Sequence, residues 1–171
     1  MRTTNLSACL LCLLLISSSF AQAPEPRPDW SAWQFVLGDG GGGPGQGSGS
    51  FSLFPDLQNS VLVRRNHADY PPQDGRKSFA HDDLMIVFRA PDTQTRADYC
   101  DSEGHVIRYT VTMAPDTHSV TFLSDSLMAG PRFRLIYTKE QDGQLGISFD
   151  MAAPGTGSSF TPYIKAFAHR K

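Results

Sequence analysis

The sequence has little cysteine, and most of it stands near the start. Of three cysteines among 171 residues, Cys9 and Cys12 lie within an N-terminal apolar stretch and only Cys100 lies beyond it. If that stretch is removed, Cys100 has no partner within the chain, so an internal disulfide is excluded. The fold must then rest on a hydrophobic core, which a chain of roughly 150 residues is long enough to bury. Cys100 itself is expected to be a small buried hydrophobe.

An excess of charge of one sign is also lacking. The chain carries 15 basic and 17 acidic residues without a long block of either sign, so nucleic acid is not expected as a partner. The signatures Gly-x-Ser-x-Gly and His-Glu-x-x-His are absent and no pair of Cys-x-x-Cys motifs is present, so no motif assigns catalysis. No second apolar run is long enough to cross a membrane, and no membrane partner is expected after the N-terminal stretch.

What the N-terminus does have is the order of a secretion signal. The single basic residue Arg2 precedes the apolar run 10–16, and the serines at 17–19 follow it, which is the order of a cleavable signal peptide. The apolar run is about half the length needed to span a bilayer. Cleavage after Ala21 is favoured over cleavage after Ala23, because the second site would place a proline just beyond the scissile bond.

A lipidated N-terminus is the alternative, because residues 6–9 (LSAC) look like a lipidation box. The cysteine comes before the apolar run instead of after it, which argues against a lipid anchor. The sequence therefore predicts a signal peptide over 1–21, a proline-rich flexible leader over 22–29 and one domain over 30–171. We expect the mature chain to be exported, to the periplasm or out of the cell.

The mature chain consists largely of short apolar alternations separated by turn residues, which is typical of consecutive antiparallel strands. Trp30, Trp33 and Leu37 have helical spacing after a candidate N-cap, Asp29, so one or two helical turns should precede the strands. The glycine-rich stretch 38–50 is not expected to hold regular structure. Strands are expected near 50–54, 57–67, 82–90, 95–101, 105–113, 118–124, 131–139, 144–152 and 160–169.

No long helical pattern interrupts these strands, so the predicted fold class is all-β. The most economical arrangement is a single antiparallel up-and-down β-barrel of eight to ten strands, with a short N-terminal helix. Closure of the sheet into a barrel removes exposed strand edges. A β-sandwich is the alternative.

Alternation along the strands predicts which side chains line the interior. In the second expected strand, the face with the larger number of apolar residues is predicted to point inward, and it ends in Arg65 and His67. In the fifth, the inward face carries His105 and Tyr109, and in the strand near 131–139 it carries Phe133, Leu135 and Tyr137. Polar tips on otherwise apolar faces predict a pocket that holds one small molecule.

The charged residues of these strands allow several interpretations. His67 could bond a ligand, hold a metal, act as a general base or bond a loop carbonyl at a strand end. His81, followed by Asp82 and Asp83, could pair with His67 to bind a cation or orient an imidazole, or it could be solvated. An inward Arg65 would need an acidic partner or an anionic ligand.

The segments 35–43 (FVLGDGGGG), 149–155 (FDMAAPG) and 160–170 (FTPYIKAFAHR) carry a resemblance to a known group. They resemble the two chain ends of nitrobindin-type barrels, within the lipocalin-like (calycin-type) proteins, which open on an FLxGxWxGxGxG segment. In haem-binding members a histidine of the last strand ligates iron, and the matching position here is Tyr163. The resemblance implies a lipocalin-like pocket protein that lacks this histidine.

Together these patterns predict an exported barrel of no assigned activity that binds a small, partly apolar molecule in its interior. The residues expected to contact that ligand are Arg65, His67, His81, His105, Tyr109 and Tyr163. One alternative is an enzyme that uses His67 or His81 as a base with a nearby carboxylate. The other is haem bound through the Tyr163 phenolate. No catalytic residue, metal or cofactor is assigned, and an enzyme is the less favoured interpretation.

Overall fold

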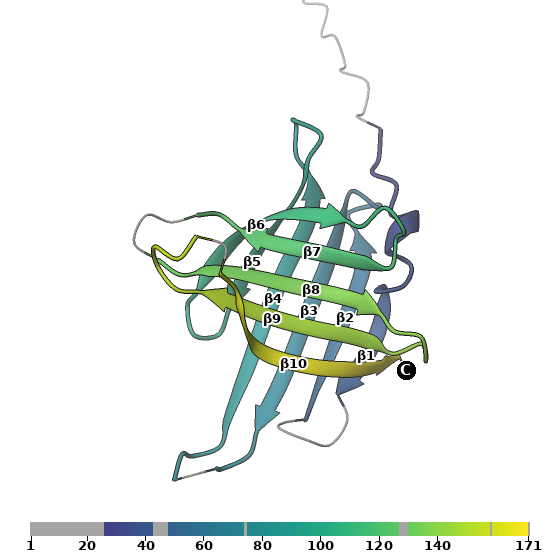
Figure 1. Cartoon of the computed structure of the whole chain (residues 1–171). Coiled ribbons are helices and arrows are strands. Elements are labelled where there is room, and N and C mark those ends of the chain that lie inside the picture. The colour runs from purple at the N-terminus through teal and green to yellow at the C-terminus, as the bar shows by residue number, and fades with distance from the viewer. Residues whose placement is uncertain (1–25, 43–47, 74, 127–129, 158, 171) are drawn as a thin grey trace, which may run out of the picture.

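The described part of this computed structural model contains ten strands and one 3-10 turn, joined by loops and turns (Figure 1). The structure describes residues 26–42, 48–73, 75–126, 130–157 and 159–170. The predicted signal peptide and the first residues of the predicted leader lie outside the described residues. The strands are β1 Gly38–Gly42, β2 Ser48–Asp56, β3 Val61–Tyr70, β4 Phe79–Arg89, β5 Thr95–Asp101, β6 Val106–Met113, β7 Ser119–Ser124, β8 Arg132–Lys139, β9 Leu145–Ala152 and β10 Thr161–Arg170.

The strands close into one barrel, in which every neighbouring pair is antiparallel. Strands that follow one another in the sequence pair with one another, and β1 closes the wall by pairing with both β2 and β10. The all-β, up-and-down barrel predicted from the sequence is confirmed. No helix among the described residues is long and apolar enough to cross a membrane.

Strand β1 forms within the glycine-rich stretch, where the sequence predicts no regular structure. Its backbone is held on both sides, with Gly40 paired to Phe51 on β2 and to Arg170 on β10. A side chain at Gly40 would collide with the Phe51 ring, so glycine allows β1 to lie close beside a buried aromatic residue. Pairing with its neighbours therefore overrides the low strand propensity of this segment.

A 3-10 turn, Ser31–Trp33, stands where the sequence predicts a short helix. Asp29, the predicted N-cap, accepts hydrogen bonds from the backbone nitrogen and the hydroxyl of Ser31 at 2.9 and 3.1 Å. These bonds satisfy donors at the start of the turn that would otherwise lack partners.

The two tryptophans of this segment plug one end of the barrel. The Trp30 indole donates to the carbonyl of Asn59 at 2.9 Å, and the Trp33 ring packs edge-on against Phe122, with 6.0 Å between centroids. Both tryptophans are buried. Figure 1 shows this turn at the same end of the barrel as the C-terminus, and we call it the plugged end.

Apolar side chains from around the wall fill the interior as one cluster with the plug. Burial of each large apolar side chain contributes about 1.5–3 kcal/mol. The predicted inward faces of β6 and β8 are confirmed by the burial of Tyr109, Leu135 and Tyr137. The largest fully buried side chains are Tyr137, Phe122, Leu53, Leu62, Met85, Val36, Val87 and Val120.

The inward face predicted for β3 is wrong. Leu62 and Arg64 are the buried residues, at 0% and 8% exposure, whereas Arg65 is exposed on the outer wall together with His67. Both faces of this strand carry apolar residues, so alternation alone does not decide which face is inward. On the outer wall, Val63 pairs with apolar residues of β2 and β4, and this apolar row gives the outer face its misleading pattern.

Candidate functional site

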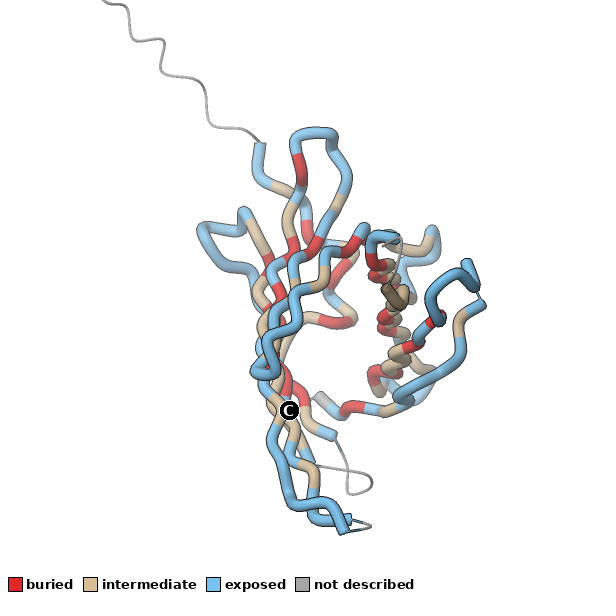
Figure 2. Tube along the Cα trace, turned by 90° about the vertical axis from the view of Figure 1, so that its left-hand side faces the viewer, coloured by how far each residue is buried: buried red, intermediate tan, exposed pale blue. Residues whose placement is uncertain are grey.

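Polar side chains gather inside the barrel toward the end opposite the tryptophan plug, which we call the open end. The connections after β3, β5 and β9 border this end, and the β3–β4 hairpin extends beyond the wall as an exposed arm (Figure 2). The inward faces of β3, β4 and β5 are apolar near the plug and polar toward the open end. The polar inward residues are Arg64, Asn66, His81, Asp83, Tyr99 and Asp101.

Asp83 is the centre of the buried part of this polar group. Its Oδ1 accepts a hydrogen bond from Arg64 Nη1 at 2.7 Å, and its Oδ2 accepts one from Asn66 at 2.9 Å. The side chains of Arg64 and Asp83 are only 10% and 4% exposed. Burial raises the pKa of Asp83, while Arg64 and Asn66 act in the opposite direction. Loss of either charged partner would leave the other charge buried and uncompensated.

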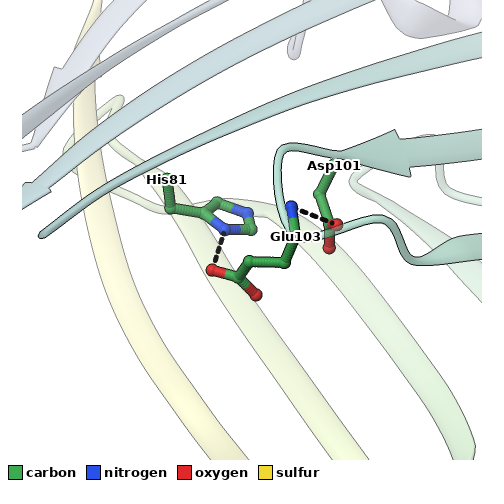
Figure 3. A group of neighbouring side chains, drawn as sticks. All are labelled: His81, Asp101 and Glu103. Atoms are coloured by element: carbon green, nitrogen blue, oxygen red, sulfur yellow. Dashed lines mark hydrogen bonds and ion pairs between the residues drawn. The ribbon is translucent and has the colours of Figure 1, made fainter.

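His81 connects this buried pair to carboxylates nearer the rim. Its Nε2 lies 3.2 Å from the Tyr99 hydroxyl and 3.6 Å from Asp83 Oδ2. Its Nδ1 lies 3.1 Å from Oε1 of Glu103, as Figure 3 shows. The His81 side chain is 20% exposed. This predicted site residue therefore lies on the inner wall, with polar partners at both ring nitrogens.

Asp101 ends β5, and several donors hold its carboxylate in place. Oδ1 accepts the backbone N–H groups of Glu103 and His105 at 3.0 and 2.9 Å. Oδ2 accepts the Tyr99 hydroxyl at 3.2 Å and lies 2.8 Å from His105 Nδ1. Burial tends to raise the pKa of Asp101, but the bonds from His105 and Glu103 lower it overall. Gly104 allows the turn with its φ of +90°.

The opposite side of the open end is aromatic. Phe133 of β8 and Phe149 of β9 stack with centroids 5.6 Å apart, and Tyr163 of β10 packs edge-on against Phe149 at 6.3 Å. On the exposed hairpin, Tyr70 and Phe79 stack at 4.6 Å. Because Tyr163 is 69% exposed, a haem ligated by its hydroxyl would lie at the rim of the barrel and not inside it.

Two buried polar atoms in the interior lack hydrogen-bond partners in the described part of the chain. Arg64 lies over the Tyr137 ring, with 5.9 Å from Cζ to the ring centroid. Within the described chain, neither Arg64 Nε nor the Tyr137 hydroxyl has a hydrogen-bond partner, which is uncommon for buried polar atoms. Burial raises the pKa of Tyr137 and of Tyr109, a predicted site residue that is buried in the same interior.

A separate hollow of about 790 Å³ lies on the outer wall across β1 to β5. His67 lines it, with Nδ1 2.8 Å from Asp82 Oδ1 and Nε2 3.1 Å from Asp69 Oδ2. The hydrogen bond to Asp82 contributes most to raising the pKa of His67, and the bond to Asp69 raises it further. A carboxylate thus occupies each ring nitrogen, and His67 is not placed to accept a proton from a substrate. The outward side chains around the hollow are Asp39, Ser50, Ser52, Arg65, His67, Asp82, Leu84, Cys100 and Ser102.

Cys100 is exposed in this hollow, so the prediction that it is buried is wrong. It lies opposite Leu84 on the outer face of β5, while Ala97 and Tyr99 of the same strand point inward. Side chains alternate between the two faces of a strand, so the inward positions of Ala97 and Tyr99 place Cys100 on the outer face. Burial of one small apolar side chain is too weak to turn the whole strand over.

The six predicted site residues thus fall in three places: the outer hollow, the core and the open end. Arg65 and His67 line the outer hollow, and Tyr109 lies in the core. At the open end, His81 and His105 are joined through Asp101 and Tyr99, and Tyr163 lies across from them on the rim. Sequence reasoning missed Arg64, Tyr137, Asp101 and Glu103. The Asp-Ser-Glu-Gly turn at 101–104 was the available signal for the last two, because an Asp at such a turn bonds the backbone that follows it.

No protein-family model matches the chain, and no curated protein is significantly similar to it in sequence. The class of protein is therefore defined by its architecture, which is a closed, ten-stranded antiparallel β-barrel. This architecture is consistent with the lipocalin-like barrels.

Proposed function

We propose that this chain is an exported, lipocalin-like binding protein, related to nitrobindin-type barrels, that holds a small, partly apolar molecule at the open end. The observation that carries the proposal is the pair of buried donors, Arg64 Nε and the Tyr137 hydroxyl, which have no hydrogen-bond partner among the residues that the structure describes. A ligand oxygen with negative charge, as in a carboxylate or sulfonate, is the acceptor that such donors favour. The aromatic side, with Phe133 and Phe149, supplies apolar contact.

The proposal changes the set of contact residues predicted from the sequence. Arg64 takes the role expected of Arg65, because it is the inward arginine of β3. Tyr109 keeps its place in the interior, and Tyr163 keeps one at the rim, where its ring and not its exposed hydroxyl would contact the ligand. Asp83 already neutralises Arg64 through Nη1, so the ligand would bond the guanidinium edge that Asp83 does not occupy.

Two fluorescent probes test the proposed acceptor. 8-Anilinonaphthalene-1-sulfonate and N-phenyl-1-naphthylamine share their aromatic rings, but only the first carries a negative charge. We expect the sulfonate to bind more tightly to the wild type. Tyr137→Phe should weaken it by about tenfold, since a hydrogen bond to a charged group contributes about 1.5–3 kcal/mol, and should leave the uncharged probe unchanged.

Tyr163→Phe is the matched control, because its hydroxyl lies on an exposed ring at the rim. It should change neither affinity, and circular dichroism should show that both variants keep the strand content of the wild type. Equal binding of the two probes by the wild type, or a Tyr137→Phe variant that binds the sulfonate normally, would contradict the proposed acceptor.

Export is tested separately, by expressing the full chain in a bacterium and sequencing the N-terminus of the product. We expect a mature chain that begins at Gln22. Ala21→Asp should prevent cleavage at that position, because signal peptidase requires a small residue there. Recovery of the uncleaved chain from the cytoplasm alone would contradict export without bearing on the ligand.

A further inference from the structure

His81, Asp101 and Glu103 form a cluster at the open end that the organic ligand proposed above does not use. One ligand atom from each of the three side chains lies within 4.8 Å of the other two. The residues come from β4, from the end of β5 and from the turn that follows it, and Figure 3 shows them converging. The cluster is therefore built by the pairing of β4 with β5, not by one loop alone.

The mixture of ligand types selects among metals. Imidazole nitrogen suits zinc, iron, nickel and copper, whereas magnesium and calcium prefer sites made of oxygen only. The cluster offers three protein ligands, the number that catalytic zinc sites use, in which a fourth position stays open for water or a substrate. The chemistry of the set thus favours a divalent first-row transition metal.

The groups around the cluster already orient its ligands. His105 and Tyr99 hold Oδ2 of Asp101 at 2.8 and 3.2 Å. If His81 Nδ1, the nitrogen that faces Glu103, binds the metal, then Nε2 carries the proton and donates it to the Tyr99 hydroxyl, 3.2 Å away, with Asp83 Oδ2 at 3.6 Å. A hydrogen-bond acceptor behind the metal-bound histidine fixes the orientation of the ring.

The cluster is also accessible from solvent and protected from below. The Glu103 side chain is 49% exposed, whereas those of His81 and Asp101 are 20% and 4% exposed. An ion could therefore enter at the rim, past Glu103, and meet two ligands that are already held in place.

The outer hollow shows that the residue types alone do not make such a cluster. His67 also contacts two carboxylates, but Asp82 lies at Nδ1 and Asp69 at Nε2. The imidazole ring separates these two carboxylates, so one ion cannot reach both of them and a ring nitrogen. His67 with Asp69 and Asp82 is thus a natural comparison within the same molecule.

We infer that His81, Asp101 and Glu103 form a binding site for a divalent transition metal ion such as zinc at the open end of the barrel. The sequence assigns no metal, and this inference does not depend on the small molecule proposed above. The ion would add a positive centre to the rim, on the side of the barrel that faces the aromatic residues of β8, β9 and β10.

Calorimetric titration of the tag-free, chelator-treated protein with Zn²⁺ tests the site. We expect one equivalent to bind, and excess Mg²⁺ not to displace it. Glu103→Gln should weaken zinc binding by at least about tenfold. Because Glu103 is half exposed and its backbone makes the turn contacts, this variant should fold normally. Asp101→Asn should weaken binding similarly.

His67→Gln is the matched control and should bind zinc as the wild type does. Zn²⁺ should also raise the melting temperature of the wild type and of His67→Gln, but not that of Glu103→Gln at the same concentration. The inference is wrong if the wild type shows no saturable zinc binding, if Glu103→Gln binds zinc as tightly, or if His67→Gln loses as much affinity as Glu103→Gln.

Discussion

Strands β3 and β4 present a histidine beside an aspartate on each face of the barrel wall. On the inner face His81 lies 3.6 Å from Asp83, and on the outer face His67 lies 2.8 Å from Asp82. The outer contact is the shorter one. Yet the Asp83 side chain is 4% exposed and that of Asp82 is 66% exposed. The face of the wall on which each histidine–aspartate pair lies, and not the distance between the partners, therefore decides how strongly the partners interact.

The reason is the medium between the charges. Water screens a pair on the outer face, where exposed ion pairs contribute about 0–1 kcal/mol to stability. Inside the barrel the effective dielectric constant is lower, so attraction is stronger and an unpaired charge is costly. The inner group can therefore hold fixed geometry for a ligand or an ion, whereas the outer group responds to pH and salt.

The largest difference between the two faces should appear when their aspartates are removed. Asp83→Ala should lower the free energy of unfolding by about 3–5 kcal/mol, because it leaves Arg64 buried without its counter-charge. Asp82→Ala should lower it by at most about 1 kcal/mol. Urea denaturation measures both changes.

The double variant Arg64→Met with Asp83→Leu provides the control for this pair. It should be more stable than Asp83→Ala, since apolar residues of similar volume replace a buried ion pair at little net cost. If the two single aspartate variants were equally stable, the inner and outer faces would not differ in the way described.

A pair of intermediate burial sharpens the comparison, because it lies on the outer wall and is nevertheless covered. Asp150 accepts Arg134 Nε and Nη2 at 2.9 and 2.7 Å, its side chain is 3% exposed, and Arg134 Cζ lies 4.5 Å from the Phe160 ring centroid. Asp150→Asn should cost about 1.5–3 kcal/mol in urea denaturation, the range for hydrogen bonds to charged groups.

The exposed pair Asp92–Arg96 is the control for Asp150. Its two atoms are 2.6 Å apart, but both side chains are nearly half exposed. Asp92→Asn should therefore cost clearly less stability than Asp150→Asn, because water screens the exposed pair. A cost for Asp150→Asn as small as that for Asp92→Asn would show that cover by a single aromatic ring does not substitute for the barrel interior.

The sequence predicted the features that depend on local pattern. Alternation and turn residues predicted the barrel. The inward faces of Tyr109 and Tyr137 were predicted as well, because most apolar residues of their strands lie on one side. The face of β3 could not be predicted in this way, since the outer wall also carries an apolar row that includes Val63. Strand β1 was missed because its stability comes from pairing, with no contribution from glycine propensity.

The candidate metal site also lay beyond local pattern. It requires the register in which Asp83 pairs with Asp101, because this register brings His81 alongside the turn that carries Glu103. The sequence separates His81 from Glu103 by 22 positions, and no rule of local spacing joins them. Long-range register was therefore the missing information, both for this cluster and for the pairing of Arg64 with Asp83.

The smallest expected effect concerns the outer histidine and is a change of stability with pH. Bonds to Asp82 and Asp69 raise the pKa of His67, so the protonated form is favoured in the folded state. The resulting stabilisation is fully present below the unfolded pKa of about 6.5 and is lost as the pH rises through the higher folded pKa. The stability difference between wild type and His67→Gln should therefore shrink across that window in urea denaturation.

Salt distinguishes this effect from a simple change of packing. The His67 side chain is 44% exposed and both carboxylates are more exposed still, so added salt should screen the attraction. An NMR titration of the His67 ring should give a pKa above the usual value at low ionic strength and a lower one at high ionic strength. A difference between wild type and His67→Gln that stays constant with pH and salt would mean that His67 acts on the outer wall through shape alone.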